Sequence, residues 1–209
     1  MVLVFNDFIR HLFPRMVLKE NLKISYTFCL GGMAFTLFLV LAISGLLLAM
    51  YYQPHSEHAY ASILYIEEQV FAGHFLHSLH RTASNLYLML IFLHTVRVLL
   101  TGAYRPPRQM NWLIGFLLLC LALFSGYTGY LLPMDQLALW ATQTGMELVR
   151  ILPLGEWLYR FMVPDAVGEP LSLLRFYMLH VVVLPMLTVA LCALHFYKIR
   201  KQKGALPYL

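Results

Sequence analysis

Apolar residues in this chain gather in four long runs, separated by segments rich in proline, glycine and charge. The runs cover residues 24–52, 77–100, 112–132 and 173–197. Each is long enough to cross a bilayer, which takes about 20 helical residues. Backbone polar groups in lipid need partners within the segment, and the alternation typical of barrel strands is absent, so the runs predict helices. The pattern indicates an all-α membrane protein, a four-helix bundle forming one domain over residues 1–209.

The segments between these runs are of three kinds. Residues 1–23 mix apolar and charged side chains, which predicts an amphipathic helix lying in the membrane interface. Residues 53–73 form a mostly polar and acidic connection. Residues 134–170 form the long connection, where apolar stretches too short to span are broken by prolines and glycine. Two short interfacial helices fit this last segment.

Composition agrees with a membrane protein. Sixty per cent of the 209 residues are apolar and only 12% are charged, against about 25% charged in a soluble domain. Mean hydropathy is +0.69. This balance excludes a water-soluble enzyme and a disordered chain. The net charge of +5 does not indicate a nucleic-acid partner, because the basic residues lie between the apolar runs.

Lysine and arginine are distributed unevenly between the two sides of the predicted membrane. With four spans, both termini share one side with the connection between the second and third runs, and that side carries eleven of the 15 basic residues. Eight of the ten acidic residues lie on the other side. Because cytoplasmic loops carry an excess of basic residues, we expect both termini in the cytoplasm.

Two pairs of histidines carry the candidate chemistry. His80 and His94 are 14 residues apart on the second run, about 21 Å along a helix. His180 and His195 are 15 residues apart on the fourth run, with Pro185 between them to bend the helix. Both spacings are close to four turns, so each pair lies near one face. The second and fourth runs share a direction, so the upper histidines can face each other, as can the lower ones.

This layering predicts two bis-histidine sites stacked across the membrane. An ionisable residue inside a membrane is costly and marks a functional site. Neutral imidazole is a good axial ligand for haem iron, and two imidazoles leave no open position, which suits electron transfer. A zinc site would need four converging ligands without such layers.

Glycines repeat with the same period on the other two runs. Gly31 and Gly45 are 14 residues apart on the first run, and Gly115 and Gly129 are 14 apart on the third. Glycine lets a backbone approach a bulky planar group closely. Membrane helices are rich in glycine in any case, which is the alternative for either pair alone.

Two arginines adjoin the histidines. Arg97 lies one turn beyond His94, and Arg81 follows His80. Each either pairs with a haem propionate or extends to the membrane interface.

Several short motifs coincide with one known family. They are Phe28-Cys29-Leu30-Gly31-Gly32, His80-Arg81, His94-x-x-Arg97, Thr128-Gly129-Tyr130-x-x-Pro133-x-Asp135-Gln136, Arg175-Phe176-Tyr177-x-x-His180 and Ile199-Arg200-Lys201-Gln202. Over about Tyr26 to Lys203, the chain resembles the cytochrome b family, and most closely its short four-helix form, cytochrome b6. The 15-residue gap on the fourth run is similar to the b6 branch.

The resemblance implies a set of cofactors and their ligands. Two haem b groups would bind, one to His80 and His180 on the positive side, the other to His94 and His195 on the cytoplasmic side. Cys29 would hold a covalent haem c, although a lone thiol is otherwise a small apolar residue. The remaining candidates are haem-packing Gly31, Gly45, Gly115 and Gly129, propionate partners Arg81 and Arg97, and Arg200 and Lys201 near haem c or quinone.

Three positions depart from the family pattern. His77 stands where an arginine is usual, His74 replaces a tryptophan, and Met134 replaces the tryptophan between Pro133 and Asp135. The two histidines either carry protons near the positive surface or are interfacial polar residues. The departures indicate a bacterial relative located in the inner (plasma) membrane.

The resemblance also implies a function and partners. It indicates a subunit of a quinol–cytochrome c oxidoreductase of the b6f or bc type. Such a subunit transfers electrons between quinol-oxidising and quinone-reducing sites, coupled to proton translocation. The family's quinol-oxidising Pro-Glu-Trp-Tyr segment is not matched by the chain's Gly155-Glu156-Trp157-Leu158-Tyr159, so this chain alone leaves that site incomplete.

We therefore expect a second membrane subunit carrying the Pro-Glu-Trp-Tyr segment, a Rieske iron–sulfur protein and a c-type cytochrome, in a dimeric complex within lipid. The alternative is a dihaem membrane anchor of a different quinone-linked respiratory reductase.

Overall fold

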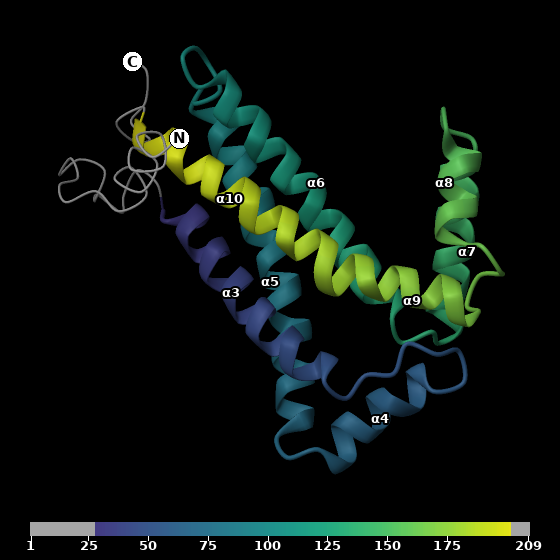
Figure 1. Ribbon diagram of the computed structural model, residues 1–209. Helices are drawn as coiled ribbons and strands as arrows, with labels where there is room; N and C mark the ends of the chain where they lie inside the picture. The colour runs from purple at the N-terminus through teal and green to yellow at the C-terminus, as the bar shows by residue number, and fades with distance from the viewer. Residues whose placement is uncertain (1–27, 202–209) are drawn as a thin grey trace, which may run out of the picture. The chain divides into compact units, whose positions relative to one another are not determined.

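The computed structural model describes residues 28–201, and every regular element in that range is helical (Figure 1). This confirms the predicted all-α class; the predicted amphipathic segment 1–23 lies outside the described residues. Four helical stretches are long and apolar enough to cross a membrane. They are α3 (Leu30–Ala49), α5 (Gly73–Leu100), α6 (Gln109–Leu131) and the run Pro170–Lys201, which contains α9 (Pro170–Met178), the π-helical turn η2 (Leu179–Val183) and α10 (Leu184–Lys201).

The observed ends differ from the predicted runs for local reasons. Helix α3 starts at Leu30 rather than residue 24, directly after Phe28 and Cys29, whose φ angles of 49° and 50° are left-handed. The fourth stretch begins at Pro170, because proline is preorganised for the first helical position.

One helix lies in a segment expected to be a polar loop. Helix α4 spans Ala59–Gln69 in the connection between α3 and α5. Its buried residues are Ala59, Ser62 and Ile66, spaced as one helical face requires. Only one of these three residues, Ile66, has a large apolar side chain, so the apolar signal is weak and the sequence pattern did not reveal this helix.

The long connection after α6 contains two short helices, as its turn signals predicted. Helix α7 spans Gln136–Arg150 and helix α8 spans Gly155–Met162. The Asp135 side chain caps α7 by accepting a hydrogen bond from the Ala138 N–H (2.8 Å), which satisfies one of the free amides of the first turn. Met146 and Met162 from these helices pack into a buried cluster with Leu131, Val163 and Phe176.

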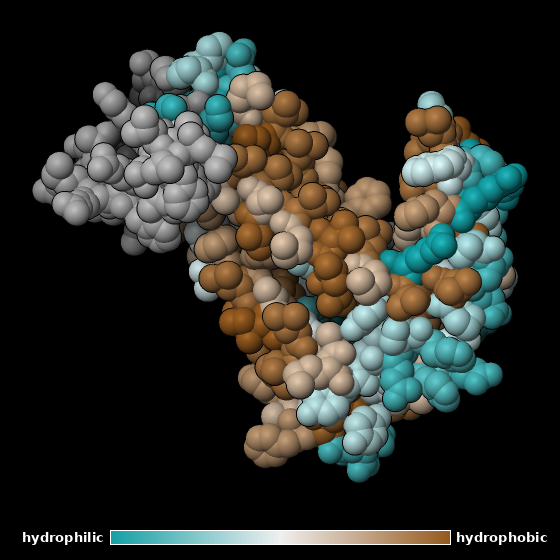
Figure 2. Space-filling model, viewed as in Figure 1, coloured by the Kyte–Doolittle hydropathy of each residue, from teal (hydrophilic) through white to brown (hydrophobic). Residues whose placement is uncertain are grey.

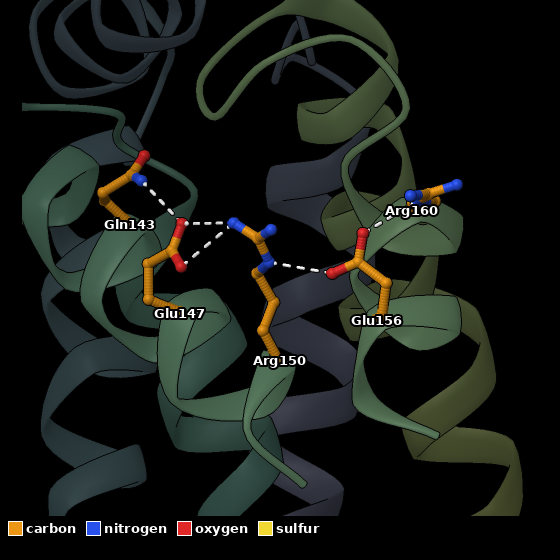
Figure 3. Close-up of polar contacts among 5 residues, drawn as sticks. All are labelled: Gln143, Glu147, Arg150, Glu156 and Arg160. Carbon is orange, nitrogen blue, oxygen red and sulfur yellow. Dashed lines mark hydrogen bonds and ion pairs between the residues drawn. The ribbon is translucent and has the colours of Figure 1, made fainter. Parts of the chain in front are cut away.

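An ion network joins α7 to α8. The Arg150 side chain lies between Glu147 and Glu156 and donates hydrogen bonds to both (Figure 3). Glu156 also accepts a hydrogen bond from Arg160 (2.8 Å). These side chains are exposed, so solvent screens the attraction between them.

The chain divides into two compact units, and each combines segments that are distant in sequence. The first unit takes the described parts of Met1–Phe38, Leu86–Leu123 and Met186–Leu209; the second takes Leu39–Asn85 and Phe124–Pro185. The division falls within the long helices rather than between them. Each unit consequently contains one of the two predicted histidine sets: His94 with His195 in the first, His80 with His180 in the second.

Large apolar side chains cover the outer surfaces of the spanning helices. Ile43, Leu46, Phe92 and Met186 are each more than 60% exposed. Figure 2 shows hydrophobic residues over α3 and α10, and a mixture of hydrophilic and hydrophobic residues over the α7–α8 region. An apolar surface of this extent on a helix of spanning length is typical of contact with lipid.

Candidate functional site

In the second unit, the predicted positive-side ligands face each other. His80 lies on α5 and His180 lies on the π-helical turn η2. Their ring centroids are 6.5 Å apart, and the rings are inclined at 76°. If both imidazoles bind one metal ion from opposite sides, the distance between their ring centroids is the sum of two metal–nitrogen bonds of about 2 Å and two nitrogen-to-centroid distances of about 1 Å, which is roughly 6 Å. The separation therefore fits one metal ion ligated by both imidazoles.

A serine hydroxyl sets the orientation of His80. Ser44 on α3 is 2% exposed, and its Oγ lies 2.9 Å from Nδ1 of His80. The same hydroxyl donates to the Val40 carbonyl at 2.7 Å. A hydroxyl has one proton, so Oγ accepts the hydrogen bond from His80. We therefore assign the proton to Nδ1, which leaves the lone pair on Nε2 for iron.

A threonine hydroxyl does the same for His180. Thr128 on α6 is 1% exposed, with Oγ1 3.1 Å from Nδ1 of His180. Its proton is donated to the Phe124 carbonyl at 2.9 Å. Both imidazoles of this unit thus have the neutral tautomer that an axial ligand needs, each fixed by a buried hydroxyl.

All four predicted glycines lie against the histidine rings, one to each. A Cβ on Gly45 would lie 3.1 Å from Cε1 of His80, and one on Gly129 would lie 2.7 Å from Cε1 of His180. Such distances are shorter than ordinary van der Waals contact. The glycines therefore leave room for the imidazoles, a role more specific than the expected approach to a planar cofactor.

The first unit repeats this pairing. A Cβ on Gly31 would lie 3.2 Å from Cε1 of His94, and one on Gly115 would lie 3.3 Å from Cε1 of His195. By contrast, a Cβ on the adjacent Gly32 would meet nothing within 4 Å. Close approach is therefore specific to the glycines that face a histidine.

The two histidines of the first unit line one cavity together with polar side chains. The cavity is lined by His94, Arg97, Arg108, Asn111 and His195, among other residues. Within the described part of the chain, Oδ1 of Asn111 is buried without a hydrogen-bond partner, whereas the imidazole of His195 has a hydrogen bond with the Asn111 backbone. A half-open cavity with two imidazoles, two guanidinium groups and an amide fits a cofactor that combines a metal with negatively charged substituents.

The fourth spanning stretch accommodates its longer histidine spacing through η2. The Leu184 N–H donates to the carbonyl of Leu179, an i to i−5 bond, so this turn contains more residues than an α-helical turn. Pro185 follows directly and lacks an N–H. The extra residue between His180 and His195 is absorbed in the wider turn, where the sequence alone suggested only a bend.

The remaining predicted residues lie outside these two clusters. The Cys29 side chain is exposed, and its carbonyl accepts the first helical hydrogen bond from the Met33 N–H (2.9 Å). Arg81 is exposed on α5. Arg200 and Lys201 are exposed at the end of α10, where Nζ of Lys201 lies 3.1 Å from the Tyr197 hydroxyl.

The histidine that replaces the family's arginine has a carboxylate partner. Nδ1 of His77 lies 2.6 Å from Oε1 of Glu67 on α4. His74 is exposed at the start of α5. The helix that the sequence pattern missed therefore supplies the group that His77 contacts.

Four residues of these sites were not predicted from sequence: Ser44, Thr128, Arg108 and Asn111. A signal for the first two is present, because a hydroxyl residue directly precedes Gly45 on the first run and Gly129 on the third. Arg108 belongs to the Pro107-Arg108 pair, which is one of the segments similar to the family, but the sequence alone assigns it no role. Asn111 has no such signal, and the positions of both residues beside the cavity depend on how α5, α6 and α10 pack in this unit.

Comparison with known proteins agrees with this arrangement. A family model described as "Cytochrome b/b6/petB" matches residues 16–203. Cytochrome b6 of Heliobacterium mobile is 41% identical over 200 residues, covering 95% of this chain and 91% of that protein. The menaquinol:cytochrome c reductase cytochrome b subunit of Bacillus subtilis (strain 168) is 36% identical over 202 residues, covering 95% and 90%.

The fold also has a solved counterpart. A chain of a hyperthermophilic respiratory Complex III matches with a TM-score of 0.80 at 23% identity, over 96% of this chain and 55% of that one. This chain thus spans about half the length of that structure's chain. The likeness shows the fold, and it agrees with the predicted bundle of four spanning helices.

Proposed function

Because this chain belongs to the cytochrome b family, we propose that it is the dihaem subunit of a quinol–cytochrome c oxidoreductase of the b6f or bc type. In this role it transfers electrons across the membrane between a quinol-oxidising and a quinone-reducing site, coupled to proton translocation. The observation that carries the proposal is the pairing of His80 with His180, at a ring separation that fits one iron, with a buried hydroxyl beside each Nδ1.

The chain's contribution is ligation, orientation and charge. When bound, each haem supplies a one-electron iron couple. His80 and His180 would hold one haem iron, and His94 and His195 the other. Ser44 and Thr128 keep the first two imidazoles in the ligating tautomer.

Guanidinium groups would meet the haem propionates. In the first unit, Arg97 and Arg108 line the same cavity as His94 and His195, and guanidinium pairs well with carboxylate. Arg81, which follows His80, is the corresponding candidate in the second unit, and it is exposed. His77 is bonded to Glu67 and is therefore not assigned to a propionate.

Cys29 is the proposed attachment point for a covalent haem c. Cys29 is exposed directly before the start of α3, in the same unit as His94 and His195. Arg200 and Lys201, exposed at the end of α10 in that unit, are proposed to neighbour this haem or the quinone at the reducing site. Cys120 and Cys192 are half-buried and have no proposed role.

We further propose the setting of the subunit. It lies in a bacterial inner membrane with both termini cytoplasmic, because eleven of 15 basic residues share the side of the termini. A second membrane subunit would supply the Pro-Glu-Trp-Tyr segment, and a Rieske protein and a c-type cytochrome would complete a dimeric complex. The named relatives support this setting over a different reductase, since one is a cytochrome b6 and another is a subunit of a menaquinol:cytochrome c reductase.

A pyridine haemochrome assay on the purified chain, before and after acid–acetone extraction, tests the proposal. Two extractable haem b groups per chain and one resistant haem c are the expected result. Two haem b groups without any extraction-resistant haem c would contradict only the role proposed for Cys29. A folded chain without haem would overturn the proposal.

Two substitutions assign the cofactors to residues. His94→Ala should remove one haem b and keep the other, and retention of both with unchanged spectra would contradict the ligand assignment. Cys29→Ala should abolish covalent haem while both haem b groups remain. Haem staining of the denatured Cys29→Ala chain would contradict the thioether, and Cys192→Ala is the matched control.

A further inference from the structure

A second cluster of metal-ligating side chains lies away from the haem ligands, in the turn between α3 and α4. One ligand atom from each of His55, Glu57 and His58 lies within 4.8 Å of the other two. The two imidazole centroids are 5.3 Å apart, and the rings are inclined at 33°. Glu57 and His58 are exposed and His55 is half-buried, so the donor atoms are accessible from solvent.

Backbone hydrogen bonds hold these three residues in one tight turn. The His55 carbonyl accepts from the N–H groups of both His58 (3.0 Å) and Ala59 (2.8 Å). The Glu57 N–H donates to Nδ1 of His55 at 3.4 Å, a long hydrogen bond that metal ligation by this neutral imidazole would replace. Ala59 is fully buried, which anchors the turn to the start of α4. The two imidazoles are therefore brought together before any ligand binds, which lowers the entropy that binding would cost.

The charge around the turn favours a divalent cation. Residues 53–73 contain three glutamates and no lysine or arginine, so no basic side chain of this connection competes for the Glu57 carboxylate. Two imidazoles and one carboxylate are a donor set that suits zinc, with water completing the tetrahedron. We infer that His55, Glu57 and His58 form a binding site for Zn²⁺, independent of the haem sites.

Zinc titration of the haem-loaded protein tests this inference. The protein is purified through a tag without histidine, treated with a chelator, and titrated with Zn²⁺ against a competing fluorescent chelator. The wild type should bind one more zinc per chain than His55→Ala/His58→Ala. Glu57→Gln should bind that zinc weaker by roughly tenfold or more. Zinc X-ray absorption of the wild type should show two imidazoles per ion.

His74→Ala is the matched control, because it removes an exposed histidine outside the cluster. It should bind zinc as the wild type does, and unchanged haem spectra would show that every variant is folded. Equal zinc binding by the wild type and the double variant would overturn the inference. Loss of zinc binding in His74→Ala to the same extent as in the double variant would also overturn the inference.

Discussion

The hydroxyl oxygen of Ser44 lies 2.9 Å from Nδ1 of His80, and its only proton is donated to the Val40 carbonyl. Ser44 therefore accepts a hydrogen bond from the imidazole and strengthens it as an electron donor to a metal. Thr128 has the same relationship to His180. Through these contacts, two buried hydroxyl residues would influence the electronic properties of an iron held by His80 and His180.

Replacing these hydroxyls should raise the reduction potential of the haem held by His80 and His180. Ser44→Ala and Thr128→Val each remove one hydrogen-bond acceptor, while the backbone hydrogen bonds of His80 with Leu41 and of His180 with Ser125 remain. The imidazoles therefore donate less to the iron, and the ferric state loses stabilisation. We expect a positive shift on the order of 59 mV, which is a tenfold change in relative affinity for a one-electron couple. Redox titration of the purified protein measures it.

Thr36→Val is the control for this titration. Its hydroxyl bonds to the Gly32 carbonyl of the same helix (3.1 Å), so its loss should leave both potentials unchanged. A shift of equal size in Thr36→Val, or none in either hydroxyl variant at His80 or His180, would contradict the proposed tuning.

Gly31 and Gly32 offer a comparison within one helical turn. The methyl group in Gly31→Ala would lie 3.2 Å from Cε1 of His94, whereas that in Gly32→Ala would meet nothing within 4 Å. Overpacking of this kind costs about 1–3 kcal/mol. We expect Gly31→Ala to lose or distort the haem bound by His94, as seen by electron paramagnetic resonance. Identical spectra for the two variants would refute the close-approach role.

The π-helical turn predicts the effect of changing the length of the fourth stretch. Each α-helical residue turns the chain by about 100°. A variant lacking Val182 has a 14-residue spacing between His180 and His195, which a helix without η2 accommodates, so it should keep both haem b groups. One alanine inserted after Val182 should lose one haem. The haem content per chain of both variants is the measurement. Loss of haem in the deletion variant but not in the insertion variant would contradict the role assigned to η2.

The α7–α8 ion network should make stability depend on pH. Hydrogen bonds from Arg160 and Arg150 hold the pKa of Glu156 below its usual value. A lowered folded pKa means that the stabilisation is complete above the unfolded pKa of about 4.3 and is lost as pH falls through the folded value. Thermal unfolding should show Glu156→Gln less stable than wild type at pH 7, with the difference disappearing in acid.

Salt provides the control for that measurement. Because these side chains are exposed, high ionic strength should shrink the difference between wild type and Glu156→Gln at pH 7. A difference that persists in acid and in high salt would show that Glu156 acts by packing rather than by charge.

The sequence by itself determined the four spanning helices, the two histidine pairs and the glycines opposite them. It could do so because a bilayer requires helices of about 20 apolar residues, and a regular helix converts spacing directly into a shared face. Because helices are regular, the 14-residue spacing of His80 and His94 and the equal spacing of Gly31 and Gly45 could be recognised as the same repeat.

Tertiary structure alone decided which side chain meets which histidine. The proton position on His80 depends on Ser44, 36 residues away, and the partner of His77 is Glu67, on a helix whose few buried residues gave no clear pattern. Asn111 on α6 and Arg108, which directly precedes that helix, line the cavity because of how this part of the chain packs. Such contacts follow from packing between segments, which local spacing does not encode.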